Sequence, residues 1–329
     1  MRAQRIVIAG GSGHLGTLLA RAFHHDGHDV IVLSRRRRRP SLTPWPTAVW
    51  DGRTLGPWAS LIDGADVVIN LAGRSVNCRY TAANRRQIVE SRLESTRVIG
   101  KAIAAAAHPP RVWLQMSTAT IYAHTFETAN DEHRGSIGGN EADAPPQWKF
   151  SIDVAQSWEA ALNAALVPKT RKVLLRTAMV MSTEEGGTFA LLRRLARLGL
   201  AGAMSGGRQW MSWIHQDDFV RAVAFLIERD DIDGAVNLAA PAPLPNGEFM
   251  AALRRACGMP VGLPHAKPLL EVAAWLMRTE TELILKSRRV LPTRLIESGF
   301  TFRWPSWPDA ARELCRLRRS GAASTVEVW

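Results

Sequence analysis

The stretch Ile6-Val7-Ile8-Ala9-Gly10-Gly11-Ser12-Gly13-His14-Leu15-Gly16 decides the fold of this chain. A short apolar run, typical of a buried strand, leads into a glycine-rich turn and then into a helical pattern. Gly10 permits a tight turn, Gly13 lets backbone N–H groups approach a diphosphate, and Gly16 lets the helix pack closely on the strand. We therefore predict that a dinucleotide binds here. The expected contacts are Gly10, Gly11, Ser12, Gly13, His14, Leu15 and Gly16.

Beyond this turn, short β-branched runs alternate with amphipathic stretches, a pattern typical of a doubly wound parallel sheet. Strands are expected at Arg5–Ala9, Asp29–Leu33, Ala48–Trp50, Asp66–Leu71, Val112–Met116 and Lys172–Arg176. Helices are expected at His14–His25, Ala82–Ala107, Gln147–Ala165, Asp217–Glu228, Gly247–Cys257, Lys267–Met277 and Pro308–Leu317. The sequence thus predicts an α/β Rossmann-type fold. Residues 1–180 would form the dinucleotide-binding domain, 181–318 a smaller, mainly helical lobe capping the substrate, and 319–329 a tail.

The end of the second strand indicates which dinucleotide binds. NAD sites usually place an Asp or Glu about twenty residues beyond the glycines, on the ribose 2′-hydroxyl. Here that place holds Ser34, followed by Arg35 and Arg36. A hydroxyl and guanidinium groups bind a 2′-phosphate, which a carboxylate would repel. One such ion pair contributes about 4 kcal/mol of Coulomb energy before desolvation. Even a third of that energy would favour binding of NADP over NAD roughly tenfold. We predict NADP, and interpret Arg37–Arg39 as a solvated basic face.

Other residues are expected at the carboxyl edge of the sheet, where ligands of open α/β sheets bind. Asp51 follows the third strand, near the expected adenine, and Arg176 ends the sixth strand facing the cleft. The fourth strand closes with Asn70, Leu71, Ala72 and Gly73. We predict that all of these contact the cofactor.

Bulk composition narrows the classes of partner. The 329 residues are 46% hydrophobic and 22% charged, which is ordinary for a globular protein. No window of about 18 apolar residues appears, and no secretory signal is recognisable, so we expect a cytoplasmic protein without a membrane partner. The net charge is +12 with only six lysines, but no nucleic-acid motif accompanies it. Three widely separated cysteines indicate neither a metal site nor a disulfide framework, and we expect reduced structural thiols.

Several motifs together resemble the extended short-chain dehydrogenases of the nucleoside-diphosphate-sugar epimerase type. They are the glycine turn, Asn70-Leu71-Ala72-Gly73, and Ser117-Thr118-Ala119-Thr120-Ile121-Tyr122. Later segments resemble the "epimerase family protein" branch, also labelled SulA-like, which ends in a domain of unknown function. These are Gly206-Gly207-Arg208-Gln209, Trp213-Ile214-His215-Gln216-Asp217-Asp218, Thr281-Glu282-Leu283 and Arg289-Val290-Leu291-Pro292.

The resemblance implies catalysis by a tyrosine, with a lysine four residues later that lowers its pKa. The chain departs from this pattern, because the helix that should hold the pair has Phe150 and Val154 instead. We therefore consider Thr118, Ser117 and Tyr122 as substitute groups near the nicotinamide. For Thr118 and Ser117 the alternative is capping of the next turn, and for Tyr122 it is core packing.

A tryptophan- and methionine-rich run lies between Arg208 and His215. We predict that these two residues bind the substrate, the alternatives being an ion pair between lobe and sheet and a structural histidine. Two functions remain open: an NADP-dependent oxidoreductase acting on an unidentified small molecule, or a non-catalytic NADP-binding sensor or interaction module. A sugar-nucleotide epimerase is disfavoured by the missing base. The resemblance also implies a homodimer, built through Ala82–Ala107 and Gln147–Ala165.

Overall fold

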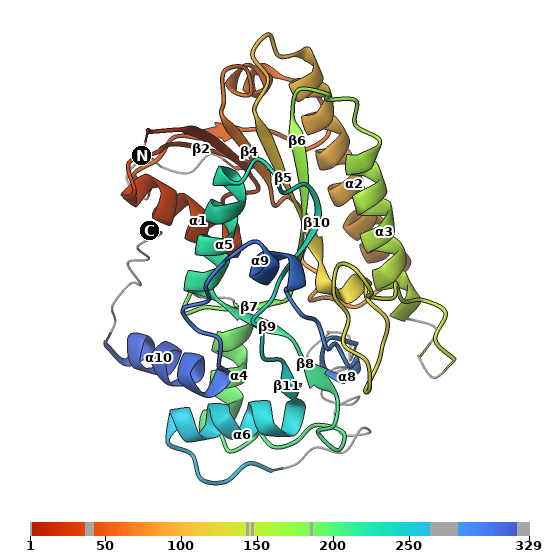
Figure 1. The fold of residues 1–329 in the computed structure, drawn as a ribbon, viewed down its shortest axis with the longest axis vertical. Coiled ribbons are helices and arrows are strands. Elements are labelled where there is room, and N and C mark those ends of the chain that lie inside the picture. The colour runs from red at the N-terminus through yellow and green to blue at the C-terminus, as the bar shows by residue number, and fades with distance from the viewer. Residues whose placement is uncertain are drawn as a thin grey trace.

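A computed structural model describes residues 2–36, 43–142, 145, 148–184, 187–263 and 282–320, and, within the last range, only the backbone of 283, 284, 319 and 320. Its centre is a seven-stranded sheet, ordered β10-β6-β5-β4-β1-β2-β3, in which every pairing is parallel (Figure 1). The strands are β1 (Arg5–Ala9), β2 (Asp29–Ser34), β3 (Thr47–Val49), β4 (Val67–Asn70), β5 (Val112–Thr118), β6 (Arg171–Thr177) and β10 (Gly234–Leu238). The order reverses between β1 and β4, which is where ligands of open α/β sheets bind.

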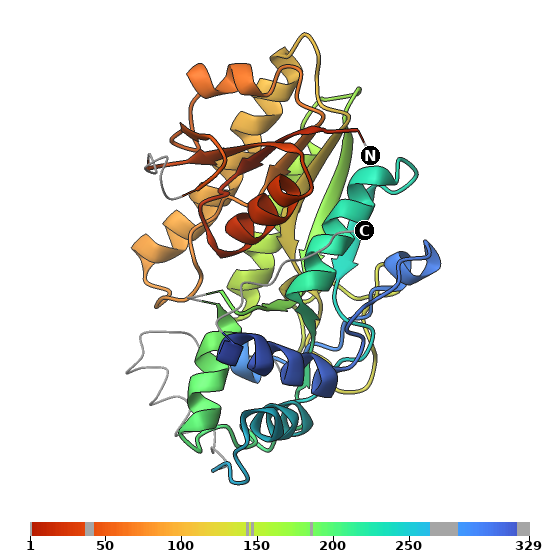
Figure 2. The ribbon, with the colours of Figure 1, turned by 90° about the vertical axis from the view of Figure 1, so that its left-hand side faces the viewer.

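Helices cover both faces of the sheet (Figure 2). One face carries α1 (His14–His25) and α5 (Gln216–Glu228), and the other carries α2 (Ala82–Ala105) and α3 (Lys149–Asn163). Because successive side chains of a strand point to opposite faces, Ile6 and Ile8 of β1 join one buried cluster, while Val7 and Ala9 join another. The predicted α/β fold with a doubly wound parallel sheet is confirmed.

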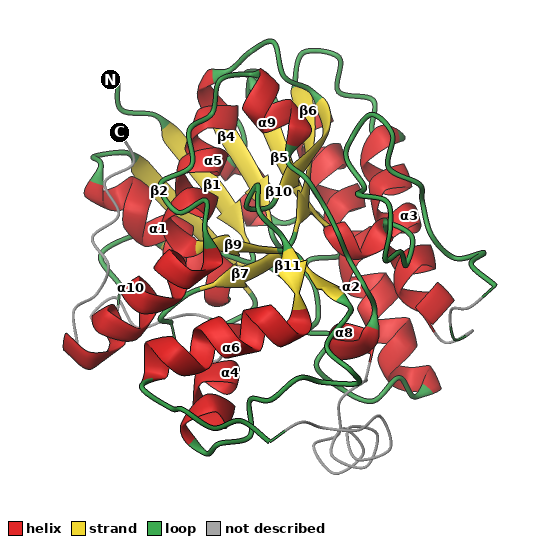
Figure 3. Cartoon of the chain, turned by 60° about the horizontal axis from the view of Figure 1, so that its bottom comes forward, coloured by secondary structure: helices red, strands yellow, loops and turns green. Residues whose placement is uncertain are grey.

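Beyond β6 the chain forms a smaller lobe below the sheet (Figure 3). Its helices are α4 (Thr188–Arg197), α6 (Asn246–Cys257) and α10 (Trp307–Ser320), with the short α8 (Glu282–Leu285). The short α9 (Thr293–Glu297) lies instead against β10 of the sheet (Figure 3). Two small ladders accompany the lobe helices: β7 (Met179–Met181) pairs with β9 (Trp213–His215), and β8 (Trp210–Met211) with β11 (Leu244–Pro245). None of the helices in the described ranges is both long and apolar enough to cross a bilayer.

The seventh strand was not predicted. β10 begins at Gly234 and contains the polar Asn237, so its five residues lack a continuous β-branched run. It nevertheless pairs with β6 along its whole length, which brings residues beyond 181 back into the sheet. The division at residue 180 stays a prediction, as does the tail. The helix expected at Lys267–Met277 and the basic run Arg37–Arg39 lie outside the described residues.

Candidate functional site

The glycine-rich turn is a set of backbone contacts that exclude side chains. A Cβ added to Gly10, whose φ is +73°, would lie 2.9 Å from the backbone nitrogen and Cα of Ala72. A Cβ on Gly16 would lie 2.4 Å from the Cα of Gly11. At the exposed Gly13, in contrast, the nearest atom to an added Cβ is the Gly10 carbonyl oxygen, at 3.4 Å. Gly10 and Gly16 therefore hold the turn against its neighbours, while Gly13 leaves its outer side open.

On its open side, the glycine-rich turn leads into the N-terminus of α1. Gly13 is the N-cap of this helix and offers no side-chain acceptor, and no acidic residue stands in the first turn. The N–H groups and the dipole of such a helix end attract an anion. His14 turns toward the lobe instead, where its Nε2 lies 2.5 Å from the Ser182 hydroxyl. Burial lowers the pKa of His14 against the opposing charge of Glu184, which favours a neutral ring beside the turn.

Ser34 joins the end of β2 to the glycine turn. Its hydroxyl donates to the Ser12 hydroxyl at 3.0 Å and accepts from the Arg36 N–H at 3.3 Å. Arg35 and Arg36 are exposed directly beyond it. The place where an NAD site has a carboxylate therefore holds a neutral hydroxyl bound to the turn, beside two solvated cations.

Two further residues predicted to contact the cofactor, Asp51 and Asn70, form hydrogen bonds within the protein. Asp51 accepts from the Arg53 and Thr54 N–H groups and from the Thr54 hydroxyl, and these hydrogen bonds, the hydroxyl first, lower its pKa to about 2. Asn70 donates to Gln115 at 2.9 Å and accepts from the Ala72 N–H at 3.0 Å. Asn70 thus shapes the bend from Leu71 to Gly73 on which the glycine turn rests.

Three predicted site residues, Ser117, Tyr122 and Arg176, meet in one buried network. Arg176 forms a bidentate ion pair with Glu159 of α3, at 2.7 and 2.9 Å. The Ser117 hydroxyl donates to the same carboxylate at 2.6 Å. Arg176 also donates to the Tyr122 hydroxyl at 3.0 Å, and that hydroxyl donates to Asn237 of β10 at 2.9 Å. The network joins β5, β6, β10 and α3 beneath the carboxyl edge of the sheet.

The network argues against three of the predicted roles. Tyr122 is fully buried, and burial raises its pKa although the charge of Arg176 opposes this. Burial alone would lower the pKa of Arg176, but the hydrogen bonds and charge of Glu159 outweigh it and raise that pKa. Because their polar groups point at one another, the network favours structural roles for Ser117, Tyr122 and Arg176, and their predicted site roles stay predictions.

Thr118 ends β5, and its hydroxyl accepts from the Thr120 N–H at 3.1 Å, capping the single turn η3 (Ala119–Ile121). This hydrogen bond agrees with the alternative role of Thr118, which is to cap the next turn. From across the lobe, Arg288 donates to the Thr120 hydroxyl and Lys286 to the Thr120 carbonyl, both at 2.9 Å. Burial and the charge of Arg288 lower the pKa of Lys286 to about 8. The sequence reasoning missed these two basic residues.

Phe150, at the place of the missing tyrosine, packs edge-on against Tyr80, with ring centroids 5.0 Å apart. The Arg85 guanidinium lies over the Phe150 ring at 4.7 Å. The half-buried Arg92 and the buried Arg288 both interact electrostatically with Tyr80. Tyr80, which comes from the segment before α2, therefore places a phenol beside Phe150. That it is one of only two tyrosines is the sole signal by which the sequence could have indicated it.

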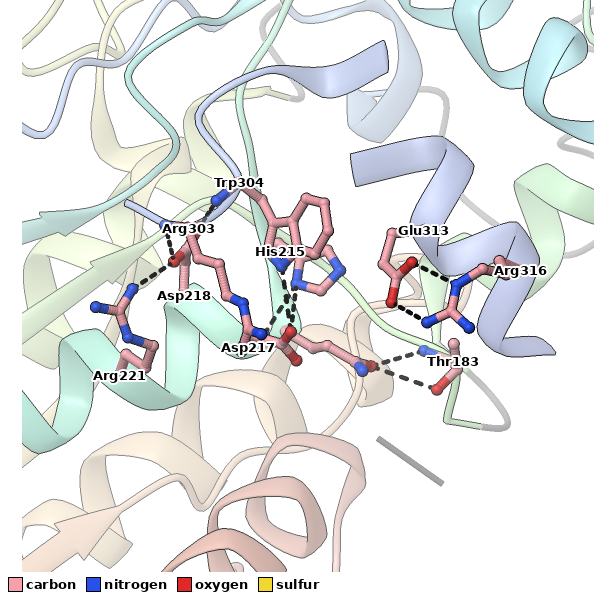
Figure 4. Close-up of polar contacts among 10 residues, drawn as sticks. Thr183, His215, Asp217, Asp218, Arg221, Arg303, Trp304, Glu313 and Arg316 are labelled. Atoms are coloured by element: carbon pink, nitrogen blue, oxygen red, sulfur yellow. Dashed lines mark hydrogen bonds and ion pairs between the residues drawn. The ribbon is translucent and has the colours of Figure 1, made fainter. Parts of the chain in front are cut away.

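The two predicted substrate contacts have different surroundings. Arg208 is exposed and lines a pocket of about 400 Å³ with Phe126, Trp210 and Glu248 among its neighbours, so its predicted role agrees with its position. His215 is fully buried, and its Nδ1 accepts from the Asp217 N–H at 3.1 Å as the cap of α5 (Figure 4). Burial, opposed by the charge of Asp217, lowers the pKa of His215 to about 4. These contacts favour the alternative of a structural histidine, while a substrate contact by His215 stays a prediction.

The seven-stranded parallel sheet, the reversal of strand order at β1 and the open glycine turn define a Rossmann-type protein of the short-chain dehydrogenase class. The model of the NAD dependent epimerase/dehydratase family matches residues 6–239, and that of a domain of unknown function, DUF1731, matches residues 267–314. The chain belongs to the NAD dependent epimerase/dehydratase family, which confirms the resemblance drawn from the motifs.

Individual relatives agree with this assignment. Bovine (Bos taurus) epimerase family protein SDR39U1 is 31% identical over 317 residues, which cover 94% of this chain and 99% of the relative. The crystal structure of human SDR39U1 with NADPH has a TM-score of 0.81 at 26% identity, covering 95% of this chain and 99% of that one. A nucleoside-diphosphate sugar epimerase from Corynebacterium glutamicum has a TM-score of 0.73 at 25% identity, covering 96% and 59% of the two chains.

The Glu159–Arg176 pair predicts a non-additive pair of substitutions. Glu159→Leu leaves the buried guanidinium uncompensated and should lower the free energy of unfolding by about 4 kcal/mol, measured by urea denaturation. The double variant Glu159→Leu/Arg176→Met removes both charges and should be more stable than the single variant. On the same helix, Asp153→Leu breaks an exposed pair with Lys149 and should cost less than about 1 kcal/mol. A double variant less stable than Glu159→Leu would contradict this account.

His215 predicts a loss of stability in mild acid. Above pH 6.5, its ordinary pKa, the ring is neutral in both the folded and the unfolded chain. As the pH falls toward 4, only the unfolded chain takes up the proton, which costs about 3 kcal/mol of folding free energy in total. His215→Asn keeps an acceptor for the Asp217 N–H and does not titrate, so its free energy of unfolding should fall less between pH 6.5 and 4. The exposed His108→Asn is the control. Equal pH dependence of His215→Asn and the native protein would refute the assignment.

Proposed function

We propose that this protein is an NADP(H)-binding oxidoreductase of the extended short-chain dehydrogenase type, acting on a small molecule. The observation that carries the proposal is the open Gly13 turn with the Ser34–Ser12 hydrogen bond at its side. A neutral hydroxyl and two exposed arginines suit a 2′-phosphate, while the cap of α1 suits a diphosphate. The NADPH in the human SDR39U1 structure supports the choice of dinucleotide.

The proposed binding residues follow the predicted set, apart from Arg176 and the bend from Asn70 to Gly73. The Gly10–Gly16 turn would hold the diphosphate, Ser34, Arg35 and Arg36 the ribose phosphate, and Asp51 would lie near the adenine. Asn70 and the bend after it support the turn from below. When bound, NADPH supplies a hydride. The chain itself must then orient the substrate and provide a proton near Thr118 at the end of β5.

We propose Tyr80 as the proton donor in place of the missing tyrosine. Its ring contacts Phe150, the position that the family's usual chemistry gives to the acid. The Arg85 guanidinium lies 5.9 Å from the centroid of the Tyr80 ring and 4.7 Å from that of Phe150, so a positive charge stands beside this pair of rings. Arg208, at the pocket lined by Phe126 and Trp210, is the proposed anchor for the substrate.

A second candidate, a non-catalytic NADP(H)-binding sensor or interaction module, has its own supporting observation. The helix that normally supplies the acid and its lysine has Phe150 and Val154, and Tyr122 is enclosed among internal partners. A homodimer through α2 and α3, a cytoplasmic location and the lack of a nucleic-acid or membrane partner stay predictions.

The cofactor assignment is tested by replacing the two exposed arginines. Arg35→Ala/Arg36→Ala should weaken NADPH binding about tenfold, because two favourable charges near the ribose phosphate are lost, while NADH binding stays the same. Titration of the purified protein, followed by nucleotide fluorescence, gives both dissociation constants. The matched control is Arg86→Ala, an exposed arginine on α2. The assignment fails if native protein prefers NADH, or if the double variant binds both nucleotides as the native protein does.

Turnover separates the two candidate functions. With NADPH and a panel of aldehydes, ketones and enals, we expect the absorbance of the reduced nicotinamide to fall for at least one compound. Tyr80→Phe should then lower kcat about 100-fold without changing NADPH affinity, because it removes only the proton donor. Unchanged kcat in Tyr80→Phe would exclude Tyr80 as the donor. Tight NADPH binding with no turnover of any compound would favour the non-catalytic candidate.

A further inference from the structure

Two of the three cysteines, 58 residues apart in the sequence, meet in the helical lobe. The sulfur of Cys257, the last residue of α6, lies 3.6 Å from the sulfur of Cys315 in α10. Cys257 is half-buried and Cys315 is buried, and the two sulfurs are not joined in a disulfide. The third cysteine, Cys78, lies in the segment before α2 and contacts the Ser75 carbonyl. The structure therefore contains a dithiol that the spacing of cysteines does not indicate.

The packing of α6 against α10 fixes how the two sulfurs approach each other. At the start of the helices, Phe249 stacks on Trp307 with ring centroids 4.0 Å apart and an angle of 7°, and the Trp307 indole donates to the Phe249 carbonyl at 2.8 Å. Cys257 and Cys315 each follow eight residues later, about 12 Å along each helix. The helices therefore run side by side in one direction, in register at both contacts (Figures 1 and 3).

Small side chains allow the helices to come this close. Ala252 of α6 and Ala310 and Ala311 of α10 lie in the same buried cluster as Phe249 and Trp307. Since the backbone positions are held by this core, the thiols are brought together before any bond forms. A disulfide requires the sulfurs to move from this contact distance of 3.6 Å to about 2.05 Å.

We propose that Cys257 and Cys315 are a redox-active dithiol that closes to a disulfide when the protein meets a small disulfide oxidant such as oxidised glutathione. The more accessible Cys257 thiolate attacks one glutathione sulfur and releases the other glutathione as a thiolate. The Cys315 thiolate then attacks the Cys257 sulfur and releases the second glutathione. Two protein thiols lose two electrons and two protons, and one glutathione disulfide becomes two thiols.

A Cys257–Cys315 disulfide would affect the candidate site, because the residues between the two cysteines contact that site. Residues 258–314 include Glu282, which accepts from Ser151 of α3, and Lys286 and Arg288, which donate to Thr120. Closing this stretch with a covalent bond restricts the unfolded chain and ties α10 to α6. The oxidised lobe is therefore expected to be more stable than the reduced lobe.

Thiol counting on the full-length protein tests the proposal. Reduced protein should react with three equivalents of a thiol reagent after denaturation, and protein treated with oxidised glutathione with one, with a Cys257–Cys315 peptide found by mass spectrometry. The melting temperature should rise by about 5 °C on oxidation. Cys78→Ser should show the same loss of two thiols and the same rise in melting temperature.

Cys257→Ser removes the half-buried thiol and should abolish both the loss of two thiols and the rise in melting temperature. Because Cys257 is more exposed than Cys315, a serine hydroxyl is better tolerated at position 257, and we expect this variant to fold. Cys315→Ser should behave alike if it folds. Three thiols remaining in the treated native protein would overturn the proposal. So would a loss of thiols in Cys257→Ser equal to that in native protein, since it would assign the oxidation to Cys78.

Discussion

The structure depends on the close approach of backbone at the glycine turn. Gly10 rests on Ala72, Gly11 on Val32 and the Ile8 carbonyl, and Gly16 on Gly11, and none of these places has room for a Cβ. These contacts with the ends of β1, β2 and β4 fix the conformation of the turn and leave the outer side of Gly13 open. The backbone that stabilises the turn is therefore the same backbone that we propose as the diphosphate site.

A second constraint is the burial of charge beneath the carboxyl edge of the sheet. The Glu159–Arg176 pair is desolvated, and it persists because Ser117 and Tyr122 satisfy the remaining hydrogen-bonding groups. Such a network favours one arrangement of β5, β6, β10 and α3 over alternatives, although a buried ion pair adds little net stability. Its hydrogen bonds also occupy the hydroxyl groups of Ser117 and Tyr122. The proton donor that we propose, Tyr80, comes from another segment and lies beside Phe150.

The lobe is joined to the sheet by polar contacts at the start of α5 (Figure 4). Asp218 is fully buried and accepts from the Arg303 and Trp304 N–H groups at 2.7 and 2.8 Å. Trp304 packs on His215 and donates to Asp217 at 3.2 Å. The chain leading to α10 therefore covers the start of α5. A substrate role for His215 would require this helix end to be open. That chain also connects the Lys286–Arg288 segment to the core of the lobe.

Features that depend on near neighbours along the chain follow from the amino-acid sequence alone. The glycine turn, α1, the first six strands and the neutral Ser34 could all be predicted, because periodicity and the conformational freedom of glycine act within a few residues. Tertiary structure alone decided which side chains meet. Arg176 binds Glu159, His215 lies beneath Trp304, Tyr80 lies beside Phe150, and Cys257 contacts Cys315. Each of these pairs joins separate elements, so its partner is set by how helices and strands pack.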